Sequence, residues 1–118
     1  MMNFRDDEGN LELGELSETW MVNDQDIPIT GAVFHSGEKV AFYGTEDNDK
    51  VIYVFSFVSE EILQDVRDGR IELLSAFTDI TAQLWQEVVE NGVIHLKETD
   101  HRTIDQAHLP EHGVFVLA

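Results

Sequence analysis

The chain of 118 residues contains no cysteine and only seven lysines and arginines. Without cysteine it can form no disulfide, no thiolate nucleophile and no zinc or iron–sulfur site with sulfur ligands. The few basic residues are scattered, so the chain lacks the positive track with which proteins hold nucleic-acid phosphates. These two shortages exclude a disulfide scaffold, cysteine-based chemistry and direct binding to nucleic acid.

Long apolar runs, glycine-rich loops and a secretory signal are also missing. The longest apolar stretches, such as residues 51–58, are far too short to cross a bilayer, and the N-terminus has no basic or apolar signal region. The eight glycines are isolated, which excludes a phosphate-cradling loop, and no serine lies in a G-x-S-x-G motif. We therefore expect a cytoplasmic protein that binds no membrane, needs no cofactor and is not an enzyme.

Acidic residues, in contrast, are abundant: 24 aspartates and glutamates give a formal net charge of −17 at pH 7. Residues 31–59 carry only −2 of this charge, whereas 1–30 carry −7 and 60–118 carry −8. Such a field repels nucleic acid and attracts basic protein surfaces. Hydrophobic residues still make up 42% of the chain, enough for one core. We predict a flexible acidic leader over residues 1–10 and a single α+β domain over residues 11–118.

Apolar runs separated by short polar turns predict four strands in the first half of the chain. These are residues 16–22, 30–35, 39–45 and 51–58. Because the connecting turns are short, the strands should form an antiparallel meander, with the β-branched and aromatic fourth strand at its centre. In the first strand we expect Leu16, Trp20 and Val22 to share one face.

One helix has clear start and stop signals near residues 59–68. Ser59 is a good N-cap, Glu60 and Glu61 fall in the first turn where the helix dipole favours acids, and Gly69 suits the C′ position. Residues 70–77 fit either a second helical turn or an extended connector.

Residues 79–96 fit two structures. Asp79 could cap a helix that pairs Leu84 with Val88, but Asn91-Gly92 lies between two β-prone runs and is a strong hairpin signal. We favour the hairpin. Residues 113–117 are expected to form a terminal strand or a tail packed against the sheet. The predicted fold class is therefore α+β, a mostly antiparallel meander with one main helix.

Residues 53–77 read YVFSFVSEEILQDVRDGRIELLSAF, in which a strand leads to a Ser-capped helix, then to Arg-x-Gly-x-Ile-x-Leu and an Ala-Phe pair. The pattern occupies Ser59, Arg67, Gly69, Ile71, Leu73, Ala76 and Phe77. It resembles the core of a family of small uncharacterised bacterial domains. The resemblance implies a shared architecture and no activity.

Candidate metal sites are weak in the sequence. His108 and His112 have the i,i+4 spacing of a helical metal pair, but Pro110 between them disrupts the helix that this spacing requires. Asp47 and Asp49 begin like a calcium loop, but the glycine of that motif is missing and turn formation explains both residues. We therefore predict no metal ligand.

The leading hypothesis is an acidic protein-binding module that engages a basic surface of a partner, as an inhibitor, an immunity-type protein or an accessory subunit. Nucleic-acid mimicry is a variant of it. The expected contacts lie on the N-terminal side, with Trp20 as an anchor, and are Glu12, Glu15, Glu18, Trp20, Asp24 and Asp26. The alternatives are a metal-dependent enzyme or ligand-binding domain that uses His95, His101, His108 and His112, and an oligomer-forming subunit.

Overall fold

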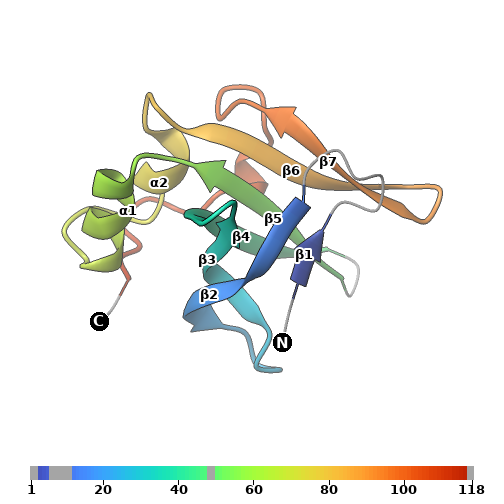
Figure 1. Ribbon diagram of the computed structural model, residues 1–118, viewed down its shortest axis with the longest axis horizontal. Helices are drawn as coiled ribbons and strands as arrows, with labels where there is room; N and C mark the ends of the chain where they lie inside the picture. The colour runs from blue at the N-terminus through green and yellow to red at the C-terminus, as the bar shows by residue number, and fades with distance from the viewer. Residues whose placement is uncertain (1–2, 6–11, 48–49, 117–118) are drawn as a thin grey trace.

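The computed structural model describes residues 3–5, 12–47 and 50–116. Over these residues seven strands form one sheet in chain order, and each neighbouring pair is antiparallel (Figure 1). The strands are β1 (Asn3–Arg5), β2 (Glu12–Val22), β3 (Pro28–His35), β4 (Glu38–Asp47), β5 (Lys50–Phe57), β6 (Gln83–Glu90) and β7 (Val93–Thr99). The predicted meander is confirmed.

The strand interpretation of residues 79–96 is correct, and the helix alternative is wrong. β6 and β7 pair from Leu84 opposite Thr99 to Glu90 opposite Val93. The two turn residues, Asn91 and Gly92, have φ angles of 53° and 77°. A two-residue turn with positive φ at both positions has the twist that antiparallel strands require, and Asn-Gly adopts it at little cost.

The main helix, α1 (Glu60–Arg67), follows the predicted signals. The Ser59 hydroxyl accepts a hydrogen bond from the Ile62 amide, and Gly69 lies just beyond the C-cap with a φ of 73°. A second helix, α2 (Ser75–Thr78), is only one turn long, so residues 70–77 form a connector that ends in a short helix. No helix in the described part of the chain is long and apolar enough to cross a membrane.

The two faces of the sheet bury separate clusters. The helices α1 and α2 lie next to each other on one side of the sheet (Figure 1). On this side Ala41 and Val54 pack with helix residues such as Leu63 and Phe77, all at most 2% exposed. The Ser56 hydroxyl on β5 donates a hydrogen bond to the Ala76 carbonyl of α2, which ties this layer to the sheet. The helices therefore complete one core and leave the other face to the sheet.

The second cluster is enclosed by the strands. Its centre is formed by Phe42 and Phe55, both fully buried. Leu16 from β2 and Leu96 from β7 pack against the same cluster, although their strands lie far apart in the order of the sheet. The sheet must therefore curve strongly around this cluster. β5 lies inside the sheet between β4 and β6, as its apolar sequence indicates.

The expectation that Leu16, Trp20 and Val22 share one face is wrong. The β2–β3 register shifts three times, between Leu16 and Glu18, between Thr19 and Met21, and between Met21 and Val22. Such β-bulges change which face the following residues point to. Leu16 therefore packs in the strand-enclosed cluster, Trp20 packs against the helix-side cluster, and Val22 is 51% exposed.

The chain after β7 crosses to the helix side. It forms the 3-10 helix η1 (Gln106–His108), and the Val114 carbonyl then accepts a hydrogen bond from the Leu73 amide at 2.7 Å. Val116 is 5% exposed. Residues 113–116 are a packed tail, so the strand alternative for them is wrong. At the other end, residues 3–5 of the predicted leader form β1, and residues 6–10 lie outside the described residues.

Candidate protein-binding surface

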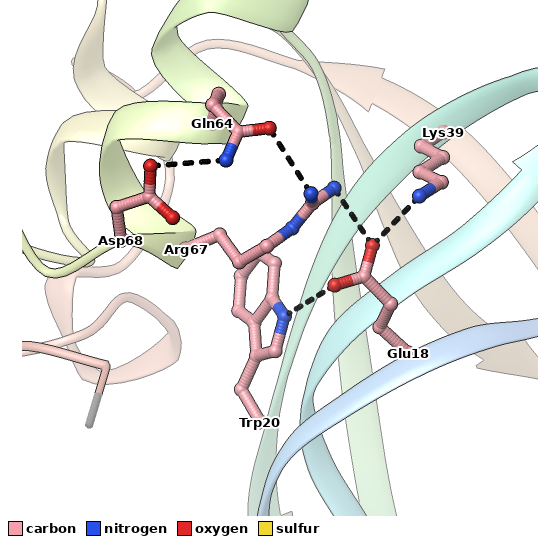
Figure 2. A network of polar contacts seen from close by, with 6 residues as sticks. All are labelled: Glu18, Trp20, Lys39, Gln64, Arg67 and Asp68. Atoms are coloured by element: carbon pink, nitrogen blue, oxygen red, sulfur yellow. Dashed lines mark hydrogen bonds and ion pairs between the residues drawn. The ribbon is translucent and has the colours of Figure 1, made fainter. Parts of the chain in front are cut away.

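Glu18 joins three elements of the fold (Figure 2). Its Oε2 lies 3.0 Å from Nζ of Lys39 on β4 and 2.8 Å from Nη2 of Arg67 on α1. Its Oε1 accepts a hydrogen bond of 3.3 Å from the indole Nε1 of Trp20. Both carboxylate oxygens of Glu18 are therefore used within the molecule.

Glu18 and Arg67 form a partly buried ion pair. Burial by itself raises the pKa of Glu18, but the hydrogen bonds from Lys39 and Trp20 and the charge of Arg67 together outweigh it and hold the pKa below its ordinary value. On the other side Arg67 donates to Gln64 Oε1 at 3.0 Å, while its buried Nε has no hydrogen-bond partner. The ionised Glu18 carboxylate therefore links β2 to α1.

The predicted contact residues divide into two groups. Glu18 and the half-buried Trp20 point into this internal network. Glu15 is exposed on β2, and Asp24 and Asp26 are exposed in the β2–β3 turn. Glu12 lies on β2 opposite Arg5, and its side chain is outside the described residues.

The β2–β3 turn is joined to the end of β4. Asn23 Oδ1 accepts hydrogen bonds from the backbone amides of Gln25 and Ile27, and Asn23 Nδ2 donates a hydrogen bond of 3.0 Å to Glu46 Oε1. This brings the exposed Glu46 next to the turn. We call Asp24, Asp26 and Glu46 the turn-end carboxylates. Sequence reasoning missed Glu46, because only the strand register reveals its neighbours.

Several of the seven basic residues contact the chain's own carboxylates. Lys39 and Arg67 share Glu18, Arg70 lies 2.9 Å from Asp65 and 3.2 Å from Asp68, and Arg102 lies 3.7 Å from Asp100. These pairs neutralise four of the seven cations locally. Only three further lysines and arginines remain for the other carboxylates of the chain, so these carboxylates keep a net negative field.

A cleft of about 490 Å³ lies where β7 ends and the α2–β6 loop passes, and we call it the β7 cleft. It is lined by Thr78, Asp79, Ile80, Ala82, Gln83, Glu98, Thr99, Asp100, His101 and Arg102. The strand register places it at the end of the sheet opposite the turn-end carboxylates. A smaller cleft of about 310 Å³ lies beside the start of α1, between Lys39 and Glu60.

The four histidines of the metal alternative lie at separate places. They are found within β7, directly after it, in η1 and in the C-terminal tail, as His95, His101, His108 and His112. His108 Nδ1 lies 3.0 Å from Thr45 Oγ1, and His112 Nδ1 lies 3.3 Å from Glu72 Oε1, so both tie the C-terminal segment to the domain. The part of the chain that the structure describes has no group of three metal-ligating side chains.

No protein-family model matches this chain, and neither a curated protein nor a solved structure matches it. The resemblance over residues 53–77 therefore stays a prediction. Any functional conclusion has to come from the surface itself.

Proposed function

We propose that the protein is an acidic protein-binding module that engages a basic surface of a partner, as an inhibitor, an immunity-type protein or an accessory subunit. The observation that carries this proposal is the distribution of charge. Cations such as Lys39, Arg67 and Arg70 are held by neighbouring carboxylates, whereas Glu15 and the turn-end carboxylates point outward. A basic partner would find a surface that repels anions and has few cations to oppose it.

Within this proposal the N-terminal contact residues have two roles. The exposed Glu15, Asp24 and Asp26, together with Glu46, meet the partner. Glu18 and Trp20 hold β2 in position through Arg67 and the helix-side cluster. Because Asn23 joins the turn to β4, the carboxylates are displayed on a turn whose conformation is set before binding, which limits the entropy lost on association.

The proposal is tested with a partner captured from the cells of origin by the full chain and then purified. We expect its association rate to fall by roughly ten-fold or more between low and high salt, because screening removes the long-range attraction. A double variant, Asp24→Asn with Asp26→Asn, should slow association further at low salt. Asparagine tolerates the positive φ of Asp26, 60°, so the turn itself should persist.

The matched control is Glu60→Gln with Glu61→Gln, which also removes two charges but at the start of α1. If both double variants slow association equally, only net charge matters and the turn is not the contact. If the rate is indifferent to salt, the electrostatic mechanism is wrong. Competition by duplex DNA for the partner would identify the mimicry form of the proposal.

We also propose that the protein works in the cytoplasm and belongs to the α+β class. The absence of cysteine supports the first statement. The packing of α1 on the meander supports the second, although the sheet dominates the fold.

A further inference from the structure

The β7 cleft lies beside a hydrophobic side chain that the fold leaves in solvent. Ile80 is 97% exposed, while Phe77 and Leu84, three residues before it and four after it, are at most 1% exposed. Ile80 lines the β7 cleft together with residues from the end of β7. Single exposed apolar residues are common on protein surfaces, so its meaning depends on how it is held and on what surrounds it.

Ile80 is held outward by a closed turn. The Asp79 carboxylate accepts hydrogen bonds from the backbone amide and the hydroxyl of Thr81, and the Asp79 carbonyl accepts from the Ala82 amide at 2.9 Å. The Asp79 amide in turn donates to the Ser75 carbonyl of α2. A turn tied on both sides of Ile80 fixes the backbone from which this side chain projects, so little backbone entropy would be lost when a partner binds there.

The charged side chains that line the β7 cleft are mainly anionic. Asp79, Glu98 and Asp100 supply three carboxylates. Glu98 accepts a hydrogen bond from Gln83, and Asp100 lies 3.6 Å from His101 Nδ1 and 3.7 Å from the single guanidinium, Arg102. Hydrogen bonds from Thr81 keep the pKa of Asp79 below its ordinary value, and the backbone amide of Arg102 does the same for Asp100. Both groups therefore stay ionised at neutral pH.

We propose that the β7 cleft docks a short segment of the partner protein in which an arginine is flanked by an apolar residue. The inference rests on the proposed function and names the place and chemistry of one contact. The guanidinium would lie between the carboxylates of the cleft, and the apolar neighbour would cover Ile80.

Arginine fits this cleft better than other groups. Its planar guanidinium has five N–H donors and can serve several carboxylates at once, whereas a lysine ammonium acts as a compact and strongly hydrated point charge. An anionic ligand would meet three carboxylates, and a purely apolar ligand would strip water from them without compensation. Covering Ile80 adds apolar burial that a free cation could not supply.

The test uses the full chain, labelled with 15N, and the peptide acetyl-Ala-Leu-Arg-Leu-Ala-amide as the probe. We expect saturable shifts of the amide resonances of residues 78–83 and 98–102, and weaker binding of the analogue with glutamine in place of arginine. Ile80→Ser should weaken binding by about five-fold, since it removes the apolar contact. Glu98→Gln should weaken it by about three-fold, which is typical of an exposed ion pair.

Matched controls separate this cleft from general acidity. Glu61→Gln removes one exposed charge from α1, and Val22→Ser removes a half-exposed apolar side chain from β2; neither should change binding. Thermal unfolding of each variant shows whether it is folded. Because all four side chains are exposed, we expect only small changes in Tm.

Three outcomes would overturn the inference. Shifts at the turn-end carboxylates instead of the cleft would leave the proposed function standing and remove this site. Equal competition by spermine would show a general polyamine site with no use for Ile80. No saturable binding of the arginine peptide would also reject the cleft, and the salt dependence of partner association would still decide the proposed function separately.

Discussion

Glu18 shows how one residue can have a role that its type does not reveal. As one of 24 acids in the sequence, it resembles its exposed neighbour Glu15. In the fold it accepts from Lys39, Arg67 and Trp20, and its side chain is 23% exposed. The charge of Glu18 is therefore used in ion pairs within the protein, whereas the exposed charge of Glu15 adds to the negative potential at the surface.

Replacing Glu18 by glutamine should destabilise the protein. Glu18→Gln leaves Lys39 and Arg67 facing a neutral group, and we expect a loss of about 1 kcal/mol in the free energy of unfolding, because the pair is only partly buried. Urea denaturation at pH 7 measures it. Glu15→Gln, on the same strand but exposed, is the control and should change stability very little.

The same pair makes stability depend on pH. The folded pKa of Glu18 lies below its ordinary value of 4.5, so its contribution is present above pH 4.5 and is lost as pH falls through the lower folded value. Wild-type protein should therefore lose its stability advantage over Glu18→Gln as the solution is acidified. A difference between the two proteins that stays constant down to pH 2 would contradict the ion-pair role.

At the scale of elements, β2 depends on a single small residue of β3. A Cβ atom on Gly31 would lie 2.0 Å from the carbonyl oxygen of Glu18, far inside contact distance. Two of the bulges of β2 lie beside this point, and they direct Glu18 and Trp20 toward the helices. Glycine at position 31 is therefore what allows β2 to approach β3 here.

Gly31→Ala should be among the most damaging single-methyl changes in the chain. Backbone atoms of β2 have to move to accommodate the new methyl, so we expect a loss of about 2 kcal/mol or more in the free energy of unfolding. Gly37→Ala is the comparison, because nothing lies within 4 Å of the added carbon and only the φ of 83° is unfavourable. That variant should lose about 1 kcal/mol. Equal losses would mean that the close approach at Gly31 is not limiting.

Elements differ in how far sequence predicts them. Ser59, Gly69 and the Asn91-Gly92 turn are local signals: each acts on backbone atoms a few residues away, so helix and hairpin were predictable. The bulges in β2 were not, because they depend on Gly31, which is distant along the chain. A strict two-residue alternation therefore assigned Trp20 and Leu16 to the same face.

At the scale of the whole molecule, the net charge of −17 works against folding. Like charges gathered on one small surface repel each other, and salt screens this repulsion over about 8–10 Å at moderate ionic strength. Salt also weakens pairs such as Glu18–Arg67, but seven lysines and arginines can pair with only a minority of the 24 carboxylates. Screening of the repulsion should therefore outweigh the weakening of the ion pairs, so that added salt stabilises the folded protein.

We expect sodium chloride to raise the Tm. Thermal unfolding between 10 and 500 mM salt measures the effect, and choline chloride at equal ionic strength should act alike if screening is the cause. Neutralising a turn-end carboxylate, as in Glu46→Gln, should slightly reduce the dependence of Tm on salt concentration. A Tm that falls with salt would show that attractive pairs, not repulsion, dominate the electrostatics of the fold.

By itself the sequence determined the net negative charge, because charge is a sum over residues. It also determined the meander, the helix and the hairpin turn, because these elements depend on residues that are close together in the chain. The tertiary structure alone decided which acids remain outside. It directed Glu18 to Arg67, joined Glu46 to Asn23 in the β2–β3 turn, and left Ile80 at the rim of a carboxylate-lined cleft. The physical reason is that exposure and ion pairing depend on strand register and packing between residues far apart in the chain.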